Sequence, residues 1–408
     1  MKDVTLILGT AVLVSGCLDS SDSARQLGGP LAQVGSGDYE VINLGTLDTT
    51  RQGGSMATAV NNLGQVVGWS RTGAEARDPN QCCVSVLVEH AFFWENGFMK
   101  DLGTLGGWES LSRATNINDR GQVVGWTSTP ANERHAFFWE NGVMTDLGTL
   151  GGGFSIPSGL NESGDVVGTS TTASGATHAF LWRGGMMQDL GTLGGSSSAA
   201  RAVNAAGQVV GESQTASGET HAFLWDGTLQ DLGTLGGTTS SATAIAETGQ
   251  ITGSSTDAAG AQHAFVWSHG VMQNLGLLPG FAASGGVLVN AQGAVTGQAT
   301  NQRFGPRHAF FWAHGVMQDL GTFGGPNTDV MGVDARGRVV GTSTNAASVL
   351  SWRAFVWEDG VLRDLGALPG HSNAQANAVN SRGDVVGRSL LDPTSDLKRA
   401  TLWRRIGG

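Results

Sequence analysis

The chain has little lysine, proline, tyrosine or charge. Its 408 residues include 9 Pro and one Tyr, charged residues make up 14%, and lysine occurs only at Lys2, Lys100 and Lys398. A net charge of -11 with so few lysines leaves no basic stripe to neutralise phosphates, so we expect no nucleic-acid partner. The scarcity of proline and the lack of a three-residue glycine period exclude a collagen-like chain.

Segments suited to long helices are also missing. Glycine accounts for 64 of the 408 residues, and each glycine in a helix interior costs about 1 kcal/mol relative to alanine. No segment avoids glycine long enough to hold a regular helix. The composition therefore argues against a helical bundle.

The motifs of common enzymes are not found. The chain lacks G-x-S-x-G, H-E-x-x-H, the phosphate-binding G-x-x-x-x-G-K-[ST] and the calcium loop D-x-[DN]-x-[DN]-G. We therefore expect no cofactor and no metal, and no motif identifies a catalytic residue. An active site assembled from scattered loop residues stays open as an alternative.

The first residues have the pattern of an export signal. The mostly apolar run from Val4 to Val14 has eleven residues, too few for a bilayer-spanning helix of about 20 residues and suited to the core of a signal peptide. It ends in Leu13-Val14-Ser15-Gly16-Cys17, which resembles the lipobox of bacterial lipoproteins. The resemblance implies cleavage before Cys17 and lipid modification of that residue, which would attach the mature chain to a membrane. Plain secretion and a buried structural cysteine are the alternatives.

The sequence divides into three parts. Residues 1–16 form the expected signal peptide, residues 17–38 a flexible tether rich in Ser, Gly and polar residues, and residues 39–408 a repeat domain. The expected location is the outer membrane or cell surface, with the periplasm or the medium as alternatives. Cys82 and Cys83 are adjacent, so an oxidising compartment favours a vicinal disulfide over free thiols or a metal site.

Three sequence blocks recur eight times from Tyr39 onward, in a unit of about 44 residues. They are N-x-x-G-Q-V-V-G, A-F-x-W and D-L-G-T-L-G-G, each with close variants. The A-F-x-W block begins at Ala91, Ala136, Ala179, Ala222, Ala264, Ala309, Ala354 and, in degraded form, Ala400. The first unit carries an insertion between Arg71 and Glu89.

Each unit is predicted to form four short strands, a to d. In the second unit these are 113–117, 122–126, 135–139 and 143–147, all rich in strand-forming residues and separated by turn signals. Two-residue type I′ turns, which need positive φ at both positions, are predicted between strands c and d. The pairs are Asn96-Gly97, Asn141-Gly142, Gly184-Gly185, His269-Gly270, His314-Gly315 and Asp359-Gly360.

The strands are apolar on both faces, so each sheet needs a neighbour on both sides. Phe92 and Trp94 are expected on one face, and Ala91 and Phe93 on the other.

The chain begins on a d-like strand (41–44) and ends on a c-like strand (400–403), which predicts that the two ends complete one sheet with Val41 near Trp403. The predicted fold is an all-β, eight-bladed β-propeller of four-stranded antiparallel blades. Seven blades with a stray half, and an open solenoid, are the alternatives.

The recurrent pattern H-A-F-F-W-E-N-G-V-M-x-D-L-G-T-L-G-G resembles the HAF family of probable extracellular repeat proteins. The match covers roughly Tyr39 to Trp403 and implies an exported repeat protein, and the family brings no established catalytic residues. Departures fall mostly in the last two copies, where Arg353 and Arg399 replace the histidine and Thr401 replaces the phenylalanine.

Six histidines occupy the same place in successive units, and a structural role is predicted for each. They are His90, His135, His178, His221, His263 and His308. A shared metal would need ligands about 2.0–2.1 Å from the ion, which equivalent positions in separate sheets cannot satisfy. Each His is instead expected to bond within its own unit, with the Asp of strand d nearest. The A-F-x-W tryptophans are predicted to belong to the core.

Function is expected where the copies differ, in the links from strand d to the next strand a, which open on one face. The candidate ligand-binding residues there are Trp108, Glu109, Phe154, Phe281, Asn327, Asp329, His371 and Asn373. Aromatics with amide and carboxylate neighbours suit a saccharide or a peptide or protein ligand. The insertion with Cys82 and Cys83 would overhang this face. Ordinary loop drift is the alternative.

The sequence therefore predicts a monomeric binding or scaffolding module attached to a membrane through Cys17. A polysaccharide hydrolase or lyase, and a purely structural envelope protein, are the competing hypotheses.

Overall fold

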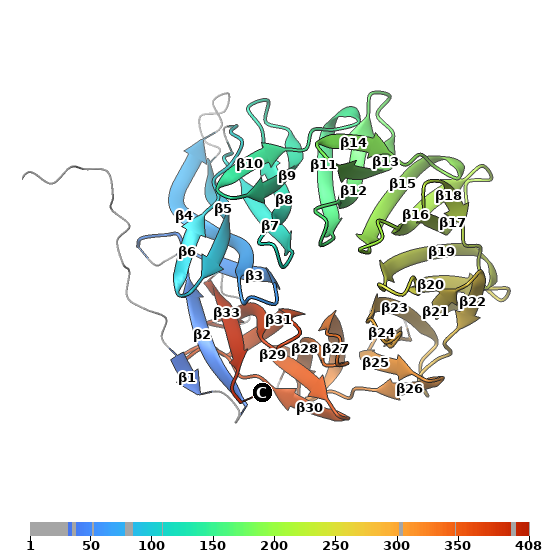
Figure 1. The fold of residues 1–408 in the computed structure, drawn as a ribbon. Helices are drawn as coiled ribbons and strands as arrows, with labels where there is room; N and C mark the ends of the chain where they lie inside the picture. Colours follow the sequence, from blue (N-terminus) through green and yellow to red (C-terminus); the bar gives the residue numbers. More distant parts are fainter. Residues whose placement is uncertain are drawn as a thin grey trace, which may run out of the picture.

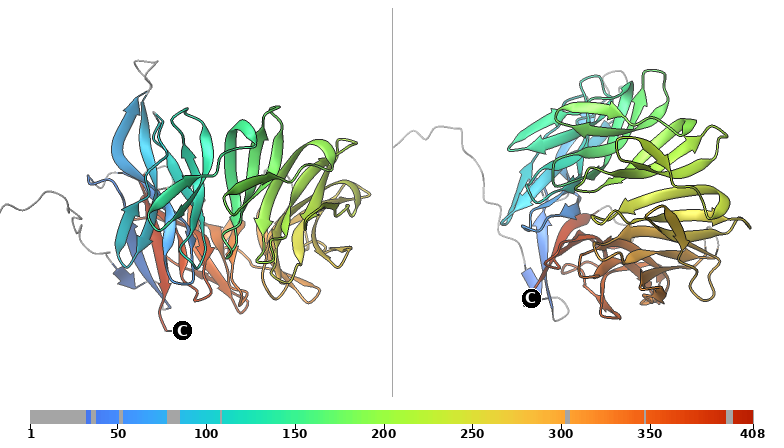
Figure 2. Two further views of the ribbon diagram at one scale, coloured as in Figure 1. Left: turned by 45° about the horizontal axis from the view of Figure 1, so that its top comes forward. Right: turned by 45° about the vertical axis from the view of Figure 1, so that its right-hand side comes forward.

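The computed structural model describes residues 32–34, 38–50, 53–77, 85–107, 109–301, 305–346, 348–392 and 397–407. Within these ranges the regular structure is all β, as predicted, and no helix has the length and apolarity to span a bilayer. Figure 1 shows small sheets following one another around a ring, and Figure 2 shows the same arrangement from two other sides. The predictions for Cys17, Cys82, Cys83 and Trp108 lie outside the described residues.

Successive units form antiparallel meanders of four strands. The first four comprise β3 (Ser55–Val60), β4 (Val66–Arg77), β5 (Ser85–Glu95), β6 (Phe98–Asp101); β7 (Ser112–Ile117), β8 (Val123–Ser128), β9 (Arg134–Glu140), β10 (Val143–Asp146); β11 (Gly151–Leu160), β12 (Val166–Thr172), β13 (Thr177–Arg183), β14 (Met186–Asp189); and β15 (Gly194–Val203), β16 (Val209–Thr215), β17 (Thr220–Trp225), β18 (Leu229–Asp231). In each meander every strand pairs antiparallel with the next.

The remaining units follow the same plan. They comprise β19 (Gly236–Ile245), β20 (Ile251–Asp257), β21 (Gln262–Ser268), β22 (Val271–Asn274); β23 (Ala283–Val289), β24 (Val295–Thr300), β25 (Arg307–Ala313), β26 (Val316–Asp319); β27 (Gly324–Val333), β28 (Val339–Asn345), β29 (Ser348–Glu358), β30 (Val361–Asp364); and β31 (Asn373–Val379), β32 (Val385–Leu390), β33 (Lys398–Arg405). The last unit lacks a fourth strand of its own after β33.

The turns between strands c and d have the predicted conformation. Asn96 and Gly97 have φ of 50° and 91°, and Asn141 and Gly142 have 52° and 90°. His269 and Asp359 also have positive φ, each followed by a glycine with positive φ. These values are those of type I′ turns, which match the twist of the flanking strands.

The links from strand d to strand a differ from the prediction in four units. The glycine pair was expected inside a loop, but β11, β15, β19 and β27 already begin at its first glycine. Gly151 pairs with Thr172 before the register shifts at Ser155, and its φ of 105° suits glycine. The bulge lets strand a extend while the chain changes from one sheet to the next.

The two ends of the chain meet in the predicted register. Strand β2 (Tyr39–Gly45) pairs antiparallel with β33, and Val41 lies opposite Trp403. The sheet order is β1-β2-β33-β32-β31, in which β1 (Ala32–Val34) adds an edge strand from the segment expected as tether. The recorded sheets have 5, 12, 4, 8 and 4 strands, and none of these described sheets closes on itself.

Both faces of the strands pack against neighbours, as predicted. Phe92 and Trp94 belong to a buried cluster with Ile42 and Leu402 from the two ends of the chain. Ala91, on the other face, belongs to a separate buried cluster that includes Phe137 and Trp139 of the next unit. Each sheet is therefore sandwiched between two others.

A serine hydroxyl links most units to the next, and Thr328 and Asn373 take its place at the other two junctions. The Ala91 N–H donates to Ser112 Oγ at 2.8 Å, and that hydroxyl donates to the Gly103 carbonyl. The same pair of bonds recurs through Ser155, Ser198, Ser240 and Ser284. At the ends of the chain Ala400 N–H donates to Ser55 Oγ at 2.9 Å, and Ser55 donates to the Gly45 carbonyl.

A second link uses the asparagine of the N-x-x-G block. Its amide donates to the backbone carbonyl of the equivalent residue in the next unit, over 2.9 Å for Asn61 to Asn118 and 3.0 Å for Asn161 to Asn204. Asn118, Asn204 and Asn290 make the same bond. Asn380 donates to the Asn61 carbonyl at 2.9 Å, so the last unit contacts the first as internal units contact each other.

This link generates a prediction for stability. Asn380 and Asn161 make matched bonds, because each amide also donates to an aspartate four residues on, Asp384 or Asp165. We expect Asn380→Ala and Asn161→Ala to lower the free energy of unfolding by a similar amount, about 1–3 kcal/mol, since each loses the bond to the next unit together with two backbone N–H bonds that its Oδ1 accepts in the turn. Urea denaturation followed by tryptophan fluorescence measures both.

A destabilised Asn161→Ala beside an unchanged Asn380→Ala would mean that the two ends of the chain are not held together in solution.

Candidate ligand-binding site

The copies differ most in chemistry at one position of strand b, directly after the Val-Val-Gly of the repeat. The residues there are Trp69, Trp126, Thr169, Glu212, Ser254, Gln298, Thr342 and Arg388. Trp126 lies opposite Arg113 of strand a and Ala136 of strand c. Only the first two units have tryptophan here, and these units adjoin the place where the chain ends meet.

Three cations and two indoles alternate along this part of the ring. Lys398 Nζ lies 4.5 Å from the ring centroid of Trp69. The Arg113 guanidinium lies 4.6 Å from Trp69 and 5.6 Å from Trp126, and Arg134 lies 4.3 Å from Trp126. We call these five residues the cation–indole row. It brings together strands β33, β4, β7, β8 and β9 from the last, first and second units.

Positive charge dominates at the Lys398 and Arg113 end of the row, whereas Glu109 and Glu133 lie near its Arg134 end. Burial lowers the pKa of Lys398, and the positive charge of Arg388 lowers it further, whereas Glu89 acts in the opposite direction. Burial also lowers the pKa of Arg388. Glu89 is engaged by Arg113, whose Nε donates to it at 2.9 Å. One carboxylate therefore serves several cations, an arrangement that favours an incoming anionic group.

A pocket of about 280 Å³ adjoins the row. It is lined by Glu109, Trp126, Ser128, Asn132, Glu133, Arg134 and Phe154. Glu109 comes from the link between β6 and β7, and Phe154 from β11, where it forms a parallel bridge to Arg134. Two of the predicted site residues, Glu109 and Phe154, thus lie together, beside two members of the row.

The other predicted residues make local contacts between neighbouring strands. Phe281 packs on His308 with ring centroids 5.0 Å apart. Asn327 accepts from the Arg307 N–H, and Asp329 accepts from Gln298 Nε2 at 3.0 Å and from Arg307 at 3.2 Å.

The last two predicted residues also bond locally. His371 Nδ1 lies 3.1 Å from the Pro369 carbonyl oxygen, and Asn373 is buried and accepts from the Trp352 N–H at 2.7 Å. None of these residues lines the pocket that holds Glu109 and Phe154.

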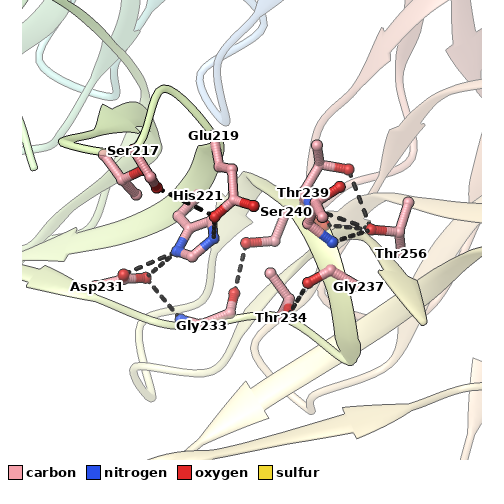
Figure 3. Close-up of polar contacts among 12 residues, drawn as sticks. Ser217, Glu219, His221, Asp231, Gly233, Thr234, Gly237, Thr239, Ser240 and Thr256 are labelled. Carbon is pink, nitrogen blue, oxygen red and sulfur yellow. Dashed lines mark hydrogen bonds and ion pairs between the residues drawn. The ribbon is translucent and has the colours of Figure 1, made fainter. Parts of the chain in front are cut away.

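The repeated histidines have the predicted structural role. His221 Nδ1 lies 2.8 Å from Asp231 Oδ2, and Asp231 accepts from the Gly233 N–H, so the pair fixes the chain after strand d (Figure 3). His90, His135, His178 and His308 make the same contact with the Asp of their own unit. His263 instead contacts Asp257, because Asn274 replaces the strand d aspartate. No group of three or more potential metal ligands occurs among the described residues.

The core prediction for the repeated aromatics needs one correction. The phenylalanine of A-F-x-W is fully buried in the first seven units, but the tryptophan is only half-buried at Trp182, Trp225 and Trp312. The phenylalanine penetrates between sheets, whereas the tryptophan lies nearer the c–d turn. Elsewhere the tryptophan is buried, and Trp403 donates from Nε1 to the Gly366 carbonyl.

Reasoning from loops missed the cation–indole row. Trp69, Trp126 and Arg113 lie within regular strands and not in the d-to-a links. The signal was nevertheless present in the sequence, because the residue after this glycine of strand b is tryptophan in two copies and a different residue type in the other six.

Comparison with known proteins reveals similarity of fold alone. No protein-family model matches the chain, and no curated protein matches it in sequence. Solved structures similar to it include a prolyl endopeptidase (12% identity, 83% of this chain and 54% of that chain, TM-score 0.52). Another is the β-propeller domain of the Trilobed protease from Pyrococcus furiosus, described as having an open velcro topology (10% identity, 77% and 99%, TM-score 0.48). The chain spans about half the length of the prolyl endopeptidase chain.

The environment of Asp329 predicts a pH-dependent effect on stability. Burial raises the pKa of the Asp329 carboxyl, although Arg307 opposes the shift. Because its pKa is higher in the folded than in the unfolded state, the protonated Asp329 carboxyl is favoured by folding. It stabilises the fold at pH values below its unfolded-state pKa, and this stabilisation is lost as the pH rises through its folded-state pKa. We expect Asp329→Asn, which cannot ionise, to be more stable than wild type at pH 7 and to lose this advantage at pH 3.5, as measured by urea denaturation.

Asp165 is the control of opposite sign. Burial acts to raise its pKa, but hydrogen bonds from Arg183 and Asn161 prevail and lower it. Asp165→Asn should therefore be less stable than wild type at pH 7, and the deficit should shrink on acidification. Equal behaviour of the two variants would contradict the assignment.

Proposed function

We propose that this protein is an exported, lipid-anchored β-propeller with eight blades that binds an acidic saccharide chain at the cation–indole row. The observation that carries the proposal is the alternation of Lys398, Trp69, Arg113, Trp126 and Arg134 beside a pocket. The eight-bladed closure is supported by the Ser55 and Asn380 bonds at the chain ends, which repeat those between internal units.

The stacked cations favour a carboxylate-bearing ligand. A guanidinium that lies over an indole keeps its N–H edge available, and its planar fork matches a carboxylate through two hydrogen bonds. In Arg113 the Nε and Nη2 groups already donate to Glu89, so Arg134 and the remaining edge of Arg113, whose side chain is 40% exposed, are the groups open to a ligand. Trp69 is only 3% exposed. A ligand would therefore meet the cations and not the face of Trp69.

The adjoining pocket suits a sugar unit of such a chain. Trp126 and Phe154 supply apolar surface, and Ser128, Asn132 and Arg134 supply hydrogen-bonding groups. Binding sites for sugars combine such apolar surfaces with a few fixed polar groups. A chain of uronic acid residues would place carboxylates along the row and one ring in the pocket.

A second candidate function is hydrolysis or elimination within the same saccharide. Glu109 and Glu133 both line the pocket, and paired carboxylates are the usual acid and base of glycoside hydrolysis. The neighbouring Arg134 could neutralise a uronate carboxylate. This candidate shares the ligand class with the first and differs from it in requiring turnover.

Binding is tested with oligogalacturonate and an uncharged glucan of equal length, by calorimetry on the full chain. We expect oligogalacturonate to bind and the glucan not to bind. Trp126→Ala and Arg134→Gln should each weaken binding at least 10-fold, since the first removes the surface on which two cations stack and the second removes one charge.

Arg307→Gln is the matched control. Arg307 also precedes the histidine of its unit, but it pairs with Asp329 away from the row. An equal loss of binding in Arg307→Gln, or no binding of oligogalacturonate, would overturn the saccharide proposal and favour a purely structural role. Release of new sugar ends that disappears in Glu109→Gln or Glu133→Gln would favour the enzyme.

The anchor is tested separately at Cys17. We expect Cys17→Ala to abolish incorporation of labelled palmitate in a bacterial host and to move the protein out of the membrane fraction, because the acyl chains supply the membrane affinity. Cys82→Ala serves as the control and should keep both label and location. A labelled Cys17→Ala variant would contradict the lipobox assignment.

A further inference from the structure

The junction of the two chain ends opens a second cavity at the opposite end of the strands. In internal units a turn of two or three residues joins strands c and d, but here β33 ends at Arg405 and β2 begins at Tyr39 without a turn. A cavity of about 780 Å³ lies at this junction. It is bordered by the a–b turns of the first, seventh and last units, whereas the row and its pocket lie toward the b–c and d–a links.

Four arginines and two carboxylates line this junction cavity. The arginines are Arg336, Arg382, Arg404 and Arg405, and the carboxylates are Glu95 and Asp384.

Two of the arginines are closely paired. Arg382 donates to Asp384 at 2.8 Å, and Arg405 donates to Glu358, outside the lining, at 3.0 Å.

The other two arginines are available to a ligand. Arg404 lies 3.8 Å from its nearest recorded carboxylate, Glu40, and both side chains are substantially exposed. Arg336 is exposed, and no side-chain partner for its guanidinium occurs among the described residues. Two guanidinium groups on different units therefore border one cavity without close neutralisation.

This charge contrasts with the rest of the same face. At the second position of the a–b turn, other units carry acids, namely Asp119, Glu162 and Glu247. At the third position Arg336 and Arg382 of the seventh and last units stand where the third to sixth units carry Ser163, Ala206, Thr248 and Gln292, and only Arg120 of the second unit, outside the cavity, is also an arginine. In a chain of net charge -11, the junction cavity is a local positive site.

The position of Arg382 is fixed by a buried neighbour. Arg338 is 1% exposed, pairs with Asp334, and donates from Nη2 to the Ser381 carbonyl at 2.9 Å. The a–b turn of the last unit is thereby held from the seventh unit. A pre-positioned arginine loses less conformational entropy on binding than a mobile one.

We infer that the junction cavity binds a small organic anion with two or more carboxylate or phosphate groups. Arginine recognises both groups through paired hydrogen bonds, and the cavity volume of about 780 Å³ is within the usual range for small-molecule sites. Leu63, 63% exposed at the cavity wall, offers apolar contact for the carbon skeleton of such a ligand. This inference does not depend on the proposed saccharide site.

The test is calorimetric titration of the full chain with citrate and with pyrophosphate at 0.15 M salt. We expect at least one of the two anions to bind, and the one that binds identifies carboxylate or phosphate as the preferred group. The double variant Arg336→Gln, Arg404→Gln should weaken that binding at least 10-fold. Both residues are exposed, so the fold should survive, which urea denaturation checks.

Arg120→Gln is the matched control, because Arg120 occupies the same turn position in the second unit, outside the cavity. It should bind the anion as wild type does, and so should Trp126→Ala. Loss of binding in Arg120→Gln, undiminished binding in the double variant, or no binding of either anion at 5 mM would overturn the inference. Loss in Trp126→Ala alone would assign the anion to the cation–indole row.

Discussion

The units are joined to one another mainly through a hydrogen bond from an asparagine amide to the backbone carbonyl of the next unit. It is made by six described asparagines, including Asn380 to Asn61 across the ends of the chain. Where Asp334 replaces the asparagine and cannot donate, Arg338 donates to the carbonyls of Ser381 and Arg382 instead. In the fifth unit Ala246 occupies the position and cannot donate, and there the Thr243 hydroxyl bonds the Gly286 carbonyl of the next unit. The two replacements keep a polar contact between neighbouring units through other side chains.

Two-sided apolar strands impose the second constraint. Val66 and Val67, consecutive in β4, are both fully buried and belong to different clusters, one shared with the last unit and one with the second. A unit at a free end would expose one such face to water. Joining β2 to β33 covers both ends at once, which explains why the first and last units need no separate capping segment.

The repeat made the fold predictable, and the same regularity concealed much of the candidate site. Periodicity predicted the strands, the type I′ turns and the register of Val41 with Trp403. Contacts between units, such as Asn61 with Asn118, could not be predicted from the sequence. An asparagine repeated at a turn is equally well explained by hydrogen bonds within that turn. The cation–indole row depends on Lys398 reaching Trp69 across the chain ends, a contact separated by more than three hundred residues.

The way each charge is neutralised distinguishes the cation–indole row from equivalent positions elsewhere in the ring. In the fourth unit Glu212 occupies the strand b position and pairs with Arg201, so the two charges cancel within the protein. At Trp126 the same position holds an indole, which stabilises Arg134 without cancelling its charge, while the neighbouring Arg113 pairs with Glu89. An aromatic ring at this position thus holds the Arg134 guanidinium in place and leaves its charge for a ligand. That difference is the physical basis for placing the proposed ligand site in this arc of the ring and not in the regular units opposite it.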